Sequence, residues 1–207
     1  MPYAIDLNRI SISEYAALLK NATLLPGRKI LLENIESNFA AIREKGIQSV
    51  GELKQAISTK RKLTAFAAES GVPREYLVVL RREIGSMEAK GVPLRNFSDI
   101  DEHMLLALEA KGIRSARDYL ERAQGTSAEL DALCELVRIN GVGAYAARAF
   151  LEAGYRRVQD VADADVAEML HRVNRANDEK KYYKVKLGEK DIRFCIDCAQ
   201  LLMRYQD

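Results

Sequence analysis

The sequence predicts an all-α protein built from about a dozen short helices. Apolar residues recur at spacings of three and four along most of the 207 residues, and no stretch alternates convincingly with period two. The 4 prolines and 12 glycines fall mostly between these periodic segments, as at Pro26-Gly27 and Gly71-Val72-Pro73, where they mark helix ends. Residues 182–188, which are partly β-branched and flanked by charge, are predicted to be a loop or extended.

The composition is that of a folded protein with no strong charge bias. Apolar residues make up 48% of the chain, which is enough to bury a core. The 32 basic and 30 acidic side chains leave a formal net charge of +2, so the composition alone gives no strong nucleic-acid signature.

Location is inferred from the cysteines and from the N-terminal residues. Cys134, Cys195 and Cys198 form an odd and sparse set, which favours free thiols in a reducing compartment and hence a cytoplasmic protein. Residues 1–6 lack the layout of a secretory signal, and no apolar run approaches the roughly 18 residues of a membrane span. We therefore expect no membrane contact.

Three segments share one pattern, centred on Gly46, Gly112 and Gly154. It predicts a helix that ends in a left-handed glycine, a sharp turn, and a new helix with an acid in its first turn. The shared positions are apolar four residues before the glycine (Ile42, Leu108, Phe150), apolar or aromatic one after it (Ile47, Ile113, Tyr155), and acidic six after it (Glu52, Asp118, Asp160).

The three copies are not equivalent. Ser49 with Glu52 predicts a capping box and Ser115 with Asp118 approximates one, whereas Arg157 cannot cap in this way. The uneven glycine spacing excludes a strict solenoid, and an additional helix over residues 59–70 accounts for much of the difference. We predict two modules, residues 1–92 and 93–207, joined near Gly91-Val92-Pro93.

The most informative local motif is Gly141-Val142-Gly143, between two predicted helices. Two glycines around one apolar residue allow a very tight turn, because both can adopt positive φ and neither adds a Cβ where the helices cross. Val142 is expected to plug the helix pair. The first backbone N–H groups of the second helix would then point outward, as an anion site suited to a phosphate.

The string Arg138-Ile139-Asn140-Gly141-Val142-Gly143, the following Gly154 and the helix over 163–174 resemble the helix-hairpin-helix superfamily of repair nucleases, ligases and Holliday-junction proteins. The string is more closely similar to an uncharacterised bacterial helix-hairpin-helix family that is labelled only as a domain of unknown function. Residues 25–28 provide a weaker counterpart near the start. Over most of the chain, the resemblance implies irregular tandem helix-hairpin-helix-like modules and sequence-independent contact with a nucleic-acid backbone.

The nucleic-acid site that this resemblance implies is only partly basic. DNA-binding members of the superfamily usually carry a lysine or arginine just after the second glycine, where this chain has Ala144. The first basic residue after the motif, Arg148, stands four before Glu152, so an ion pair on the helix surface explains it equally well. The candidate contact residues are Arg138, Asn140, Gly141, Val142, Gly143, Arg148, Lys180, Lys181 and Lys184.

Other basic clusters lie at predicted helix ends. Between Arg172 and Arg193, eight basic residues stand against four acids, and phosphate neutralisation by such a segment would give salt-dependent binding. A solvated surface is the alternative, and Tyr182 and Tyr183 in this segment could stack on bases or pack as half-buried residues. The remaining clusters are Lys60-Arg61-Lys62, Arg81-Arg82 and Arg156-Arg157.

No pattern in the sequence indicates catalysis or a cofactor. His103 and His171 lack spacing partners, and no phosphate-binding loop or dinucleotide fingerprint is present. Cys195 and Cys198 lack the further ligands that zinc requires. A helix over 189–205 would place Cys195 beside Ile192 and Cys198 beside Phe194, both as small buried thiols. The acids of Asp99-Ile100-Asp101-Glu102 could be taken for a cation site, but caps and dipole partners of a helix that begins near Glu102 explain them. We predict no catalytic residues, no metal or other cofactor, and no small-molecule substrate.

Two functions from different classes remain open. In the first, the protein is a non-enzymatic module that contacts a DNA or RNA backbone through hairpin amides and nearby cations. In the second, it is a helical protein-protein interaction scaffold whose glycine hairpins only pack helices at a steep angle. The absent basic residue after Gly143 and the near-neutral charge favour the second, whereas the superfamily resemblance and the basic 172–193 segment favour the first. We favour the first.

Overall fold

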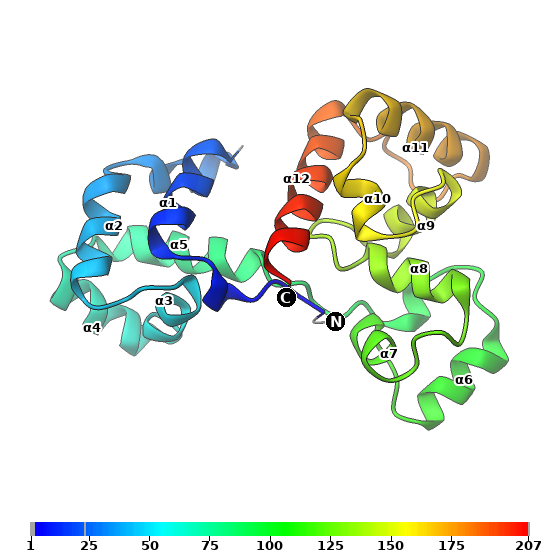
Figure 1. Ribbon diagram of the computed structural model, residues 1–207, viewed down its shortest axis with the longest axis horizontal. Helices are drawn as coiled ribbons and strands as arrows, with labels where there is room; N and C mark the ends of the chain where they lie inside the picture. Colours follow the sequence, from blue (N-terminus) through cyan, green and yellow to red (C-terminus); the bar gives the residue numbers. More distant parts are fainter. Residues whose placement is uncertain (1–2, 23, 207) are drawn as a thin grey trace. The chain divides into compact units, whose positions relative to one another are not determined.

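The computed structural model describes residues 3–22 and 24–206. Within these ranges the chain contains twelve α-helices, three 3-10 helices and no β-strand (Figure 1). The predictions of an all-α fold and of about a dozen short helices are therefore confirmed. Residues 182–188 form a loop, as expected.

Residue contacts divide the chain into two compact units. The N-terminal unit is Asp6–Glu88, and the C-terminal unit combines residues 3–5 with residues 89–206. The predicted boundary between 92 and 93 thus falls a few residues late. Residues 3–5, which were assigned to the first module, belong to the second unit because Tyr3 is buried in its core.

The N-terminal unit contains five α-helices. Two of them, α4 and α5, pack against each other, and α5 also packs on the 3-10 helix Pro26–Leu32. The fully buried side chains of this unit include Ile10, Leu53 and Leu77. Its helices are α1 (Ile12–Asn21), α2 (Ile35–Glu44), α3 (Val50–Ala56), α4 (Lys60–Ser70) and α5 (Arg74–Ser86), preceded by the 3-10 helix Leu7–Arg9.

The C-terminal unit contains seven α-helices around one apolar cluster. Its last helix, α12, packs on α10 and α11, while α9 packs between α8 and α11. The cluster includes Tyr119, Phe150 and Ile192, each without solvent exposure. The helices are α6 (Glu102–Ala110), α7 (Ala116–Arg122), α8 (Ala128–Leu136), α9 (Ala144–Glu152), α10 (Val158–Ala162), α11 (Val166–Lys180) and α12 (Glu189–Tyr205), with the 3-10 helix Leu94–Asn96 at the start.

The three predicted helix-glycine-helix corners are confirmed locally. Gly46, Gly112 and Gly154 have φ of 79°, 72° and 94°, in the left-handed region. After the second and third glycines, the next residue donates its N–H to the carbonyl five residues earlier, Ile113 to Leu108 at 3.0 Å and Tyr155 to Phe150 at 2.9 Å. This is the Schellman closure of a helix end, and it joins the two apolar positions that the pattern shares.

The helix after each corner carries an acid in its first turn. The capping boxes of Ser49 with Glu52 and of Ser115 with Asp118 are both formed. In the third corner Asp160 accepts from the backbone N–H of Arg157 at 2.9 Å, and no side chain at position 157 caps the helix, as the sequence predicted.

The first two corners share a further feature that the sequence did not reveal. Each capping serine forms an isolated antiparallel bridge with a residue earlier in the same unit. Ser49 pairs with Ser11, and Ser115 pairs with Pro93. Each bridge has two backbone hydrogen bonds, from Ile12 to Gln48 and Val50 to Ile10 in one unit, and from Leu94 to Arg114 and Ala116 to Val92 in the other. The same corner is therefore held in place in the same way in both units.

A matched pair of glycine substitutions tests the corner in the N-terminal unit. Gly46→Ala should lower the free energy of unfolding by about 1–2 kcal/mol, because an L-residue is strained at positive φ although its Cβ meets no atom. Gly85→Ala, in helix α5 and equally open, should raise it by about 0.5–1 kcal/mol. Urea unfolding followed by circular dichroism measures both. Changes of the same sign would contradict the assignment of Gly46 as the helix stop.

Candidate nucleic-acid interface at the glycine turn

The glycine turn, residues 137–143, joins α8 to α9. Gly141 adopts the left-handed conformation, with φ of 87°, but Gly143 has φ of −89° and ψ of 177°. The expectation that both glycines take positive φ is therefore wrong for Gly143, because that residue is the N-cap of α9 and is extended. Val142 is 4% exposed and plugs the turn as predicted.

Helix α9 starts without any of the usual closures. Gly143 offers no side-chain cap, and no acid lies in the first turn. Each of the other eleven α-helices in the described chain has a side-chain cap, an acid in its first turn, or both. The first N–H groups of α9 thus have no capping partner among the described residues, at the positive end of the helix dipole.

The missing basic residue after Gly143 has a packing explanation. Ala144 is 8% exposed and belongs to the apolar cluster of the C-terminal unit. A lysine or arginine there would replace a buried methyl group, so it would have to displace the core to reach solvent. Position 144 therefore selects a small side chain, whatever the turn binds.

Two aromatic side chains are exposed at the turn. Phe194, on α12, lies against Gly141, where an added Cβ would come within 2.8 Å of its Cε1 atom. Phe194 is 46% exposed and Tyr145, two residues after Gly143, is 59% exposed. Sequence analysis missed Phe194 because only the tertiary packing of α12 brings it to the turn.

Charges on α12 around Phe194 are mixed. Lys190 stands one turn before Phe194, is exposed and forms no ion pair within the described residues. Asp197 stands one turn after it, and burial raises the pKa of that carboxyl. Arg193 is engaged by Glu189 at 2.9 Å. Lys190 is therefore the cation on this stretch that is available to a ligand.

The structure places Arg138 inside the protein. It is 3% exposed, and its Nε donates to the carbonyl of Tyr3 at 3.1 Å. One terminal nitrogen donates to Glu135 and the other to Gln206, each at 2.6 Å. The guanidinium thus holds the chain start, α8 and the chain end together, and we withdraw it from the phosphate-contact residues because its donors face inward.

Arg148 is also buried, at 3% exposure. Its guanidinium pairs with Glu129 on α8 and donates to the carbonyl of Ser98. It therefore belongs to the packing of α9 against α8 rather than to a nucleic-acid surface. The alternative prediction of an ion pair was right, but its partner was wrong, because Arg148 pairs with Glu129 and not with Glu152.

Lys180, Lys181 and Lys184 are exposed, at the end of α11 and in the loop that follows it. Tyr182 stands among them. Burial raises the pKa of its hydroxyl, and the nearby carboxylate of Glu152 raises it further. Glu152 is the last residue of α9, about 13 Å from its N-cap at 1.5 Å per residue. The structure therefore does not bring these lysines together with Gly143, and Asn140 and Val142 remain with the turn.

The 172–193 segment is less basic in space than in sequence. Five of its eight cations are paired with acids of the same two helices, namely Arg172 with Glu168, Arg175 with Glu179, Lys181 and Lys186 with Asp178, and Arg193 with Glu189. Surface pairs of this kind cancel charge while adding little stability. The segment therefore behaves largely as the solvated surface that was the alternative interpretation.

Two asparagines fix the loop between α11 and α12. The amide of Asn177 both accepts from and donates to the backbone of Tyr183, at 3.0 and 3.1 Å, and Asn174 does the same with Leu187 at 3.2 and 3.0 Å. Tyr183 is half-buried, and burial raises its pKa to about 12. Packing, not base stacking, is therefore the role that its position supports.

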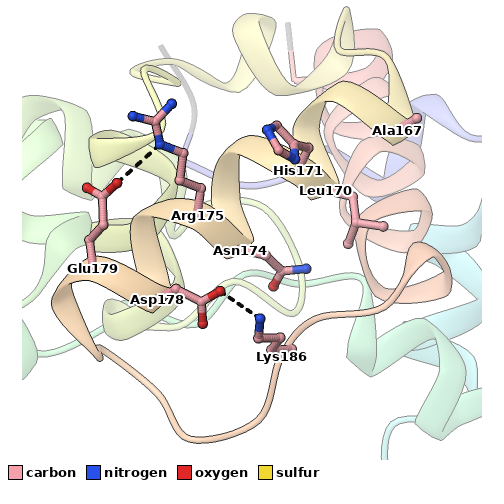
Figure 2. A pocket seen from close by; sticks show the side chains of 8 residues that line it. All are labelled: Ala167, Leu170, His171, Asn174, Arg175, Asp178, Glu179 and Lys186. Atoms are coloured by element: carbon pink, nitrogen blue, oxygen red, sulfur yellow. Dashed lines mark hydrogen bonds and ion pairs between the residues drawn. The ribbon is translucent and has the colours of Figure 1, made fainter.

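An open depression runs along this part of α11. Figure 2 shows Arg175 and Glu179 turned toward each other, and Asp178 turned toward Lys186 across its floor. The polar groups are thus satisfied by one another, and no buried nucleophile or acid-base pair lines the space. The lining residues are Ala167, Leu170, His171, Asn174, Arg175, Asp178, Glu179 and Lys186.

Cys195 takes the buried position that helix periodicity predicted, whereas Cys198 is only partly buried. Cys134 and Cys195 are buried, and burial raises the pKa of both thiols, to about 12 for Cys195. Ile192 and Ala199 share the buried face of α12 with Cys195. In the described ranges, no group of three or more histidine, cysteine or acidic residues is placed to hold a metal ion.

Comparisons with known proteins give one match. Residues 131–203 match a family described as a domain of unknown function (DUF7898). The matched range runs from within α8 to near the end of α12, so it contains the glycine turn and Phe194. No curated protein and no solved structure matches the chain. Among residues 3–22 and 24–206, no helix is both long and apolar enough to cross a membrane.

Removing Arg138 tests its structural role. Arg138→Ala should lower the free energy of unfolding by about 3 kcal/mol, because it leaves the buried partners of the guanidinium unsatisfied. Arg175→Ala, which breaks an exposed pair with Glu179, should change it by less than about 0.5 kcal/mol. Urea titrations compare the two variants, and an equally small effect of both would refute the buried role.

Proposed function

We propose that this protein is a non-enzymatic nucleic-acid-binding module that contacts the sugar-phosphate backbone, independent of sequence, through a hairpin of the helix-hairpin-helix type at the glycine turn. The contact would be made by backbone N–H groups at the start of α9. Amides recognise phosphate oxygens, which are the same at every base pair, so such contact carries no direct sequence information.

The observation that carries the proposal is the glycine at position 143. Its φ of −89° is open to any L-residue, and a Cβ built on it meets no atom within 4 Å. Ser, Thr, Asp or Asn would therefore fit and would stabilise α9 as a cap. Neither backbone conformation nor space therefore explains why α9 lacks the cap or first-turn acid that the other helices have. A ligand that binds the free amides would explain it.

The surroundings of the turn support an anionic, partly aromatic ligand. Gly143 is exposed, as is Tyr145 two residues later on α9. Lys190, on α12, is exposed as well. A phosphate at the α9 start would accept hydrogen bonds from the amides, and an exposed ring could stack on a base or sugar. Arg138 and Arg148 would support this surface only indirectly, by fixing α8 against α9 and the chain ends.

A protein-interaction scaffold remains the second candidate, and one observation favours it. Phe194 and Tyr145 expose large apolar surface at the same turn, and aromatic residues are enriched at protein interfaces. In that case the partner would bury both rings, and the state of the α9 amides would matter little.

Substitutions at Gly143 separate these functions. Gly143→Asp should cap α9 with a carboxylate, raising the free energy of unfolding by up to about 1 kcal/mol. It should also weaken binding about tenfold or more, because a hydrogen bond to a charged group contributes about 1.5–3 kcal/mol. Fluorescence anisotropy with a labelled 30-base-pair DNA duplex of mixed sequence measures binding at low salt.

Gly143→Ala is the matched control. It adds a Cβ in the same open space but no acceptor, so the amides stay free and affinity should stay close to that of the unaltered protein. Unchanged affinity in Gly143→Asp would exclude the turn as the contact point. Absence of any duplex binding by the unaltered chain at low salt would overturn the proposal in favour of the scaffold.

A further inference from the structure

A cluster of cations without ion pairs among the described residues lies in the N-terminal unit, on α4 and α5. Between residues 56 and 82 the only acids are Glu69 and Glu75. The cations there form no ion pair within the described residues, in contrast to Arg172, Arg175 and Arg193 on α11 and α12. We name as the α4–α5 basic face the five side chains Lys60, Arg61, Arg74, Arg81 and Arg82.

The packing of α4 against α5 brings together the two separate stretches of sequence that carry these cations. Arg74 Nε donates to Thr64 Oγ1 at 3.4 Å, and Arg81 donates to the carbonyl of Ser58 at 3.4 Å. The two helices therefore run antiparallel, with the later part of α5 beside the residues that precede α4 (Figure 1). Lys60, four residues before Thr64, lies on the same side of α4 as that contact.

The acids of the segment do not neutralise the face. Glu69 stands seven residues after Lys62, so these two share the other side of α4. Glu75 follows Arg74 in the first turn of α5 and is a single charge against Arg74, Arg81 and Arg82. The basic face thus keeps a clear positive excess.

The first turn of α4 is arranged against its own helix dipole. It contains Lys60, Arg61 and Lys62 and no acid, so three cations stand at the positive end of the helix. Thr59 already caps the amide of Lys62, which means that the helix end itself is closed. The cations therefore serve neither the helix end nor an ion pair, and an external polyanion is the partner that would stabilise them.

The face also lacks the features of a membrane or protein-core contact. No large apolar side chain is exposed anywhere in residues 50–88, all of which the structure describes. Peripheral membrane helices insert apolar residues, and protein interfaces rely on buried aromatic anchors. Arginines two turns apart on one helix, beside cations of the adjacent helix, instead fit the repeated charges of a phosphate backbone.

We propose that the α4–α5 basic face binds the phosphates of a nucleic acid and supplies the salt-dependent part of its affinity. This inference rests on the proposed function and adds a second surface to it. The glycine turn makes neutral amide contacts, which neutralise no phosphate with a cation. The distribution of charge agrees with this division, since Asp6–Glu88 has 13 Lys and Arg against 10 Asp and Glu, and the remainder of the chain has 19 against 20.

The salt dependence of duplex binding tests the two surfaces separately. The double variant Lys60→Glu/Arg61→Glu should lower the slope of log affinity against log salt by about 2, because each phosphate contact contributes about 0.9. The same change places acids in the first turn of α4, which favours the helix, so lost binding would not reflect unfolding. Gly143→Asn, which caps the α9 amides without a charge, should lower affinity and leave the slope unchanged.

The matched control is Lys180→Glu/Lys184→Glu, which reverses two exposed, unpaired cations of the C-terminal unit and changes net charge equally. Anisotropy of the full-length chain with the labelled duplex, at four salt concentrations, compares all variants. An equal loss of slope in the control would overturn the assignment to α4–α5. An unchanged slope in Lys60→Glu/Arg61→Glu, with Gly143→Asn still weakened, would overturn this inference alone.

Two further outcomes complete the test. Absence of duplex binding by the unaltered chain would overturn both proposals. Binding to vesicles that contain phosphatidylserine, lost in Lys60→Glu/Arg61→Glu, without binding to the duplex would assign the basic face to anionic lipid and likewise overturn the inference.

Discussion

The fold depends on how each short helix is closed at its ends. The α-helices here span 5 to 17 residues, and helices of this length gain little from their own hydrogen bonds in water. At Gly46 and Gly112 a left-handed glycine ends one helix, and a capping box starts the next within the same turn. An isolated two-bond bridge then fixes the direction in which the new helix leaves. With the helix ends specified locally, the apolar faces have few alternative ways to pack.

Helix α9 departs from this scheme at its start, although its environment permits a cap. Its residues Ala147 and Phe150 are fully buried, so tertiary packing holds the helix without help from its N-terminus. Stability that the core provides allows an exposed position to be used for another purpose. Gly141 differs in this respect, because its positive φ favours glycine. The two glycines of one motif thus have different causes, one conformational and one consistent with ligand contact.

Sequence reasoning succeeded where structure is determined locally. The glycine corners, an acidic cap before the helix at Glu102, the helix over 189–205 and its buried Cys195 all follow from spacing along one or two turns. It failed for Arg138, whose partners Tyr3 and Gln206 are distant in sequence, and for Arg148, whose partner Glu129 lies on another helix. Charge counts along the chain cannot distinguish a paired cation from a free one. The basic face was visible only as separate clusters, because the antiparallel packing of α4 and α5 brings them together.

Near-neutral net charge does not argue against a polyanionic partner once the charges are located. In the C-terminal unit most cations are paired with acids. Arg138 in the glycine turn and Arg148 on α9 are both paired and buried. A surface of neutral amides can orient a phosphate but cannot attract it over a distance, because the dipole field of a helix end falls off within about one turn. Attraction at longer range needs net charge that is not cancelled nearby, and screening limits it to about 8–10 Å at physiological salt. The α4–α5 basic face meets that requirement, so attraction and orientation would be supplied by different units of the chain.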